Sequence, residues 1–98
     1  MSLPLTEQPG LDAWLAEFDP YGILSDPQAL AQAERVEDLL QLRHRQHPSR
    51  LLDLGYYRTR YRVVVIDDFD WQTPVAHYES TDPTRILQWI QHALISYA

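Results

Sequence analysis

Apolar residues first repeat along the chain with helical spacing. The earliest set lies at positions i, i+3, i+4 and i+7, on one face of a helix, and comprises Leu11, Trp14, Leu15 and Phe18. The segment Asp19-Pro20-Tyr21-Gly22 has turn-forming composition, so this first helix is predicted to end at Phe18.

A second helix is predicted to begin at Asp26-Pro27 and to end at His47-Pro48. Asp is a favourable N-cap, and Pro is tolerated at the first helical position. The residue before a Pro disfavours the helical region, so Pro48 marks the end. The apolar stripe of this helix comprises Leu30, Ala33, Val36, Leu39 and Leu40.

After Ser49 the pattern changes to period two. Tyr61, Val63 and Val65 alternate with Arg60, Arg62, Val64 and Ile66, which predicts a strand. A second strand is predicted over residues 73–79, beyond the loop that contains Asp68–Trp71. If Asp67 pairs with Gln72, the register sets Val63 opposite Ala76, Tyr61 opposite Tyr78, Arg62 opposite His77 and Arg60 opposite Glu79.

A further strand with Leu52, Leu54 and Tyr56 is predicted before Arg58, although its turn lacks the Gly or Asn that a tight hairpin prefers. Gly55 could instead mark a bulge in one long strand.

The last helix is predicted to start at Thr81-Asp82-Pro83. Its buried stripe comprises Ile86, Leu87, Ile90, Ala93, Leu94 and Tyr97, and Trp89 lies on the flank. The predicted fold is therefore α+β, with two N-terminal helices, a small antiparallel β-meander of two or three strands, and a C-terminal helix packed on one sheet face. Residues 1–9 are predicted to form a flexible N-terminal arm, and residues 10–98 a single α+β domain.

Composition narrows the classes of function. Fourteen acidic and eight basic residues give a net charge of −6, which makes nucleic-acid binding unlikely. The chain has no cysteine, so disulfides and thiolate metal sites are excluded. The apolar runs are too short for a membrane span, and the N-terminus lacks the features of a secretion signal, so a cytoplasmic location is expected. The three glycines form no phosphate-binding loop, and no cofactor is predicted.

Two groups of residues are candidate metal ligands. Asp67, Asp68 and Asp70 offer carboxylate oxygens for Mg²⁺ or Ca²⁺, although the spacing of a calcium loop is missing and a solvated turn is the simpler explanation. His44 and His47 lie three residues apart on the predicted second helix, without an identifiable third ligand.

The feature that points most directly to function is a row of arginines on the predicted sheet. Arg58, Arg60 and Arg62 project from one face because they are spaced by two. The predicted partner-binding surface combines them with Val64, Ile66 and His77 on the same face and with Phe69 and Trp71 in the loop. Mixed arginine, apolar and aromatic surfaces are typical of protein interfaces.

This surface predicts a non-enzymatic protein–protein interaction module, such as an adaptor, an inhibitor or immunity-type protein, or an assembly factor. Its partner would be another protein, or a second copy in a homodimer. Two alternatives stay open: a solvent-facing strand whose arginines pair with Glu79, and a small metal-dependent enzyme or metal-binding protein that uses Asp67, Asp68 and Asp70.

Overall fold

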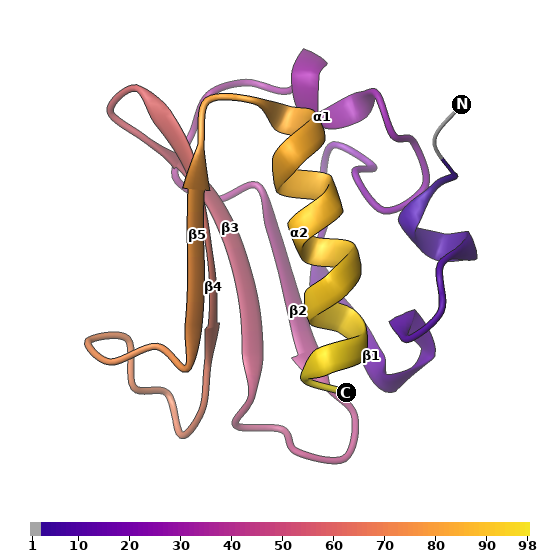
Figure 1. Ribbon diagram of the computed structural model, residues 1–98, viewed down its shortest axis with the longest axis vertical. Helices are drawn as coiled ribbons and strands as arrows, with labels where there is room; N and C mark the ends of the chain where they lie inside the picture. The colour runs from indigo at the N-terminus through magenta and orange to yellow at the C-terminus, as the bar shows by residue number, and fades with distance from the viewer. Residues whose placement is uncertain (1–2) are drawn as a thin grey trace.

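A five-stranded antiparallel sheet dominates the computed structural model, which describes residues 3–98 (Figure 1). The strands lie side by side in chain order: β1 (Trp14–Phe18), β2 (Leu40–His44), β3 (Leu51–Tyr57), β4 (Arg60–Ile66) and β5 (Ala76–Ser80). The helical elements are two 3-10 turns, η1 (Leu5–Glu7) and η2 (Leu11–Ala13), the short α1 (Ala29–Gln32) and the long α2 (Pro83–Ser96). None of the helices within residues 3–98 has the length and apolar character needed to cross a membrane.

The C-terminal helix confirms the sequence prediction. The Asp82 side chain accepts a hydrogen bond from the Thr84 N–H at 2.9 Å, and Pro83 occupies the first helical turn. The helix covers one face of the sheet with a buried stripe that comprises Ile86, Ile90, Ala93 and Leu94 (Figure 1). The class is therefore α+β, with a helix packed on one sheet face.

The prediction of a helix from Leu11 to Phe18 is wrong. Leu11–Ala13 forms one 3-10 turn, and the chain then continues as the edge strand β1. Of the four residues on the supposed helical face, Trp14 is buried, whereas Leu15 and Phe18 are exposed. The helical spacing is therefore not reflected in burial, because pairing with β2 and the burial of the Trp14 ring decide the local structure.

The second predicted helix is also wrong over most of its length. Only Ala29–Gln32 is α-helical, and the chain re-emerges as β2 at Leu40. In β2 the buried residues Leu40, Leu42 and His44 alternate with half-buried Gln41 and Arg43. This period-two alternation fits a strand with one face in the core, and pairing on both sides stabilises it.

The predicted antiparallel arrangement is confirmed, but the predicted number of two or three strands is wrong, because the described residues form five. The strand before Arg58 exists as β3, and a two-residue turn at Arg58–Thr59 joins it to β4. The hairpin between β4 and β5 has a register two residues away from the predicted one, with Val63 opposite Tyr78 and Arg62 opposite Glu79. A shift of two keeps each side chain on its predicted face, and it lengthens the connection to residues 67–75.

Most of the apolar side chains form one core between the sheet and the covering segments. The core includes Leu5, which is 5% exposed, and the neighbouring Thr6 N–H donates to the Leu24 carbonyl at 3.0 Å. Of the segment predicted as a flexible arm, residues 1 and 2 lie outside the described residues. A second, smaller apolar cluster lies on the opposite side of the sheet and comprises Leu51, Val64 and Ile66.

Candidate functional site: an arginine groove on the open face

The sheet face opposite α2, called the open face below, carries the predicted site. Strand register places Arg60, Arg62, Val64 and Ile66 of β4 on this face, with Tyr57, Gly55, Asp53 and Leu51 of β3 beside them and His77 and Glu79 on β5. Tyr61, Val63 and Val65 of β4 point to the other side and belong to the core under α2. The alternation in the sequence therefore predicted the correct face for each of these β4 residues.

One hollow gathers the predicted arginines. This arginine groove has a volume of about 610 Å³ and is lined by Tyr57, Arg58, Thr59, Arg60, Arg62, His77 and Glu79. The tight turn between β3 and β4 brings Arg58 to one end of it, with a backbone φ of 60°. A side-chain-bearing residue pays about 1–2 kcal/mol for this left-handed conformation, which glycine would avoid.

The three groove arginines differ from the other five in having no partner. No hydrogen bond, ion pair or ring contact from residues 3–98 reaches the guanidinium of Arg58, Arg60 or Arg62. Glu79 lies opposite Arg62 in the register, yet it forms no ion pair with it within 4.0 Å. The other arginines contact, in chain order, the Tyr56 ring (Arg35), Glu17 (Arg43), the Asp12 carbonyl (Arg45), Asp67 (Arg50) and Asp82 (Arg85).

Val64 and Ile66 lie on the predicted face, but they are not available to a partner. Their side chains are 7% and 0% exposed, because they pack with Leu51 in the small second cluster. The Arg43 guanidinium, 5.7 Å from the centroid of the Phe69 ring, lies beside this cluster, since Arg43 pairs with Leu51 in the register. These two side chains therefore contribute to the small cluster and offer little accessible area to a partner.

Phe69 and Trp71 are exposed, as predicted, at the far end of the sheet from the arginines. About half of each side chain is accessible, 53% for Phe69 and 50% for Trp71. Figure 1 shows the turn between β3 and β4 and the loop between β4 and β5 at opposite ends of the sheet. Asp68 and Phe69 both have positive φ, 55° and 57°, in a turn closed by the Asp70 N–H bonding to the Asp67 carbonyl.

The three carboxylates of this loop bind different partners. Asp67 holds Arg50 through two hydrogen bonds of 2.7 and 3.1 Å, and this pairing lowers the pKa of Asp67. Asp68 accepts from the Ser49 hydroxyl, and Asp70 accepts from Thr73, whose hydrogen bonds lower the pKa of Asp70. Within residues 3–98 no group of three or more acidic or histidine residues is arranged to hold a metal ion.

His44 and His47 lie at the end of β2 and in the following loop, not on a helix. The buried His44 ring accepts backbone hydrogen bonds from Gln46 and His47 at its Nδ1 and packs against Trp14. Burial lowers its pKa, and the nearby His47 lowers it further. The Nδ1 of His44 caps the following loop, so this side chain has a structural role.

The structure also brings together two carboxylates that were not predicted as a site. Asp53 is on the open face in the middle of β3, and Asp38 precedes β2. Burial, and to a smaller extent the charge of the neighbouring Asp38, raise the pKa of Asp53 from 3.8 to about 6. No hydrogen bond or ion pair within the described part of the chain reaches the Asp53 carboxylate, so its charge is uncompensated.

Because of this uncompensated charge, the free energy of unfolding is expected to depend on the protonation of Asp53. Because the folded-state pKa of Asp53 is raised, its cost in stability appears as pH rises from about 4 through 6, and is absent at lower pH. Replacing Asp53 with Asn is expected to raise the free energy of unfolding by about 1–2 kcal/mol at pH 7.5, after allowance for partial solvent exposure. Urea unfolding of both proteins between pH 3.5 and pH 8 measures this. A gain that is independent of pH would contradict it.

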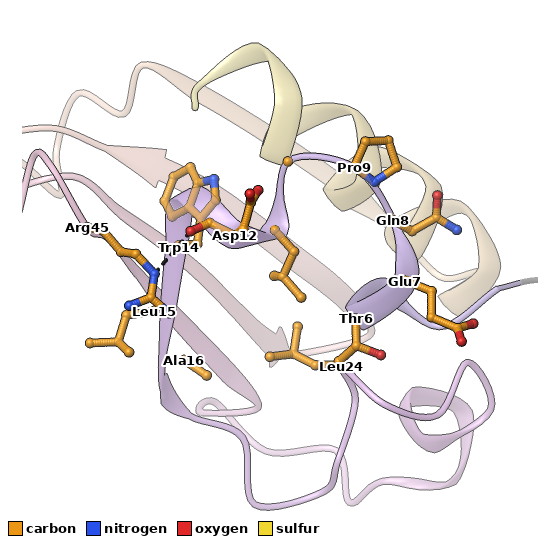
Figure 2. Close-up of a pocket in the computed structure, with 12 residues that line it drawn as sticks. Thr6, Glu7, Gln8, Pro9, Asp12, Trp14, Leu15, Ala16, Leu24 and Arg45 are labelled. Atoms are coloured by element: carbon orange, nitrogen blue, oxygen red, sulfur yellow. Dashed lines mark hydrogen bonds between the residues drawn. The ribbon is translucent and has the colours of Figure 1, made fainter.

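A larger hollow than the arginine groove lies elsewhere in the described part of the chain. It has a volume of about 790 Å³ and lies between the N-terminal segment and β1, where Figure 2 shows Thr6, Leu15 and Leu24 around it. The Arg45 side chain beside it donates to the Asp12 carbonyl at 3.1 Å. Thr6 is the only hydroxyl among the lining residues, and no histidine is among them to act as its base.

Comparison of the chain with protein-family models, with curated proteins and with solved structures gave no match. Function is therefore inferred from the chemistry of the open face.

Proposed function

We propose that this chain is a non-enzymatic protein-binding module, and that the arginine groove binds an acidic surface of its partner. The observation that carries the proposal is the presence of three guanidinium groups without an anionic partner in one groove of a chain whose net charge is −6. An adaptor, an inhibitor or immunity-type protein, or an assembly factor acting in the cytoplasm would each use such a surface.

The chemistry of arginine supports an acidic protein partner. A guanidinium presents a planar fork of donors that matches a carboxylate, so each arginine can form two parallel hydrogen bonds to one Asp or Glu. Arg60 and Arg62 are fixed by regular strand geometry, and Arg58 is held in a conformation that costs stability. Strain that persists in a native structure is often associated with function.

Phe69 and Trp71 extend the proposed surface for a partner large enough to span the sheet. The strand from Arg60 to Ile66 is seven residues long, which separates the two ends by roughly 20 Å at about 3.3 Å per residue. Trp71 supplies an exposed aromatic side chain of the type that anchors interfaces.

Reversal of the groove charges tests the proposal. The probe is a fluorescein-labelled peptide of ten glutamates, titrated with dilute protein in 20 mM salt and followed by fluorescence anisotropy. Arg60→Glu combined with Arg62→Glu is expected to weaken binding at least tenfold, because two attractive contacts become repulsive. Added salt is expected to weaken binding of the unmodified chain.

Arg85→Glu provides the matched control. Arg85 is an exposed arginine on α2, 3.9 Å from Asp82, so this variant reverses one charge outside the groove and matches Arg60→Glu alone in net charge. Circular dichroism confirms that each variant is folded. Equal loss of affinity in the Arg85 variant, or unchanged affinity in the groove variant, would contradict the proposed function.

A further inference from the structure

The open face is divided into two halves of opposite charge. The arginine groove lies over β3, β4 and β5. A second hollow of about 610 Å³, called the acidic groove, lies over β1, β2 and β3 and contains three carboxylates. Its lining residues are Leu15, Ala16, Glu17, Phe18, Asp38, Leu40, Gln41 and Asp53.

The two halves meet at Tyr57 without neutralising each other. Burial raises the pKa of Tyr57, the carboxylates of Asp53, Glu37 and Asp38 raise it further, and Arg62 lowers it. Both sets of charges therefore act on one side chain. Within residues 3–98, however, no ion pair joins an arginine of the arginine groove to a carboxylate of the acidic groove.

We propose that the open face binds a second copy of this chain through a two-fold axis, so that each arginine groove contacts the partner's acidic groove. This inference rests on the proposed function and names the partner. A two-fold axis that lies in the plane of the interface, along the boundary between the two halves, sets the positive half of one copy against the negative half of the other. A face with one positive and one negative half is therefore complementary to itself. A single acidic partner would explain the arginines but would leave Asp38 and Asp53 unpaired.

The carboxylates of the acidic groove are suited to bind the arginines of a second copy. Glu17 is already occupied by Arg43 and Gln41 of its own chain, whereas Asp38 and Asp53 accept no hydrogen bond from the described residues. A guanidinium from a second copy would supply the cation that the half-buried Asp53 lacks. Leu15 and Phe18, 46% and 43% exposed, add apolar contact area at the edge of the groove.

The size of the face predicts a weak dimer. Five strands spaced by about 4.8 Å, each five to seven residues long, form a face of roughly 400 Å². A standard stable interface buries about 800 Å² per partner, so association is expected at high micromolar concentration and to be sensitive to salt.

The inference is tested by sedimentation velocity in 20 mM salt, with protein concentrations from 10 µM to 1 mM. The unmodified chain is compared with two variants that exchange the charges of the two grooves. The unmodified chain is expected to dimerise as its concentration rises. One variant carries Arg60→Glu and Arg62→Glu, the other carries Asp38→Arg and Asp53→Asn, and each alone is expected to stay monomeric. An equimolar mixture of the two is expected to recover the dimer, because opposite charges then face each other across the interface.

Three results would overturn the inference: a monomeric unmodified chain at 1 mM, self-association of both variants at the original strength, or a mixture that stays monomeric.

Arg85→Glu is the control and is expected to dimerise like the unmodified chain. If Asp38→Arg with Asp53→Asn does not fold, Asp38→Arg alone takes its place, because this side chain is exposed. An unmodified chain that stays monomeric but binds the acidic peptide through Arg60 and Arg62 would end this inference and leave the proposed function standing. An unmodified chain that stays monomeric and does not bind the peptide would end both.

Discussion

Replacing Gly55 with Ala is expected to lower the free energy of unfolding by about 3 kcal/mol or more. A β-carbon at this position would lie 2.0 Å from the Glu37 carbonyl oxygen and 2.8 Å from the Tyr57 ring. The backbone of residues 36–39 cannot easily retreat. Hydrogen bonds from the Tyr56 N–H to the Val36 carbonyl, at 2.8 Å, and from the Leu39 N–H to the Leu54 carbonyl, at 3.0 Å, hold it on both sides.

Thermal and urea unfolding measure the effect, and Gly22→Ala is the control. Gly22 has a φ of 70°, but its β-carbon would meet only the Ser25 hydroxyl at 3.6 Å. Its substitution therefore costs only the backbone conformation, about 1 kcal/mol. A Gly55 variant as stable as the Gly22 variant would show that the chain does not approach Gly55 this closely.

Replacing Trp14 with Ala is expected to destabilise the protein by about 3–5 kcal/mol. The side chain is 2% exposed, its ring packs edge-on against His44 at 5.2 Å, and its Nε1–H donates to the Leu94 carbonyl at 3.2 Å. Trp14 thus joins the edge strand β1 to the end of α2. Its loss removes buried aromatic area and leaves the Leu94 carbonyl without this donor.

Trp14→Phe separates the two contributions. It retains most of the buried ring and removes the hydrogen bond, so a loss of about 1–2 kcal/mol is expected in urea unfolding. A cost below about 1 kcal/mol for Trp14→Ala would show that β1 is not anchored through this residue.

Sequence reasoning succeeded where local signals agreed with one another. The cap at Asp82 and the apolar stripe from Ile86 to Leu94 predicted α2, and period-two alternation predicted β3 and β4. It failed for β1 and β2, where tertiary pairing decides the structure. The alternation of Leu40, Leu42 and His44 was a visible signal for β2, but the helical spacing that precedes it predicted a longer helix.

The site could be predicted only in part, for a related reason. Spacing by two placed Arg60 and Arg62 together, because neighbours on one strand face are local in sequence. Arg58 was predicted on the same strand face, but it reaches the groove from the turn before β4. The burial of Ile66 depends on its pairing with Leu51, fifteen residues away. Asp38 and Asp53 are also fifteen residues apart and come together through the packing around β2 and β3. The one sequence signal for this pair was the presence of a single carboxylate, Asp53, in the apolar run of β3.

The most direct test of the central claim is the response of the eight arginine Nε–Hε signals to the glutamate peptide, measured by NMR at a protein concentration where the chain is monomeric. The signals of Arg58, Arg60 and Arg62 are expected to shift in parallel as peptide is added, since these guanidinium groups have no partner to release. Those of Arg43 and Arg50, which hold Glu17 and Asp67, are expected to stay unchanged. Shifts spread evenly over all the arginines, or absent from the groove, would contradict the account.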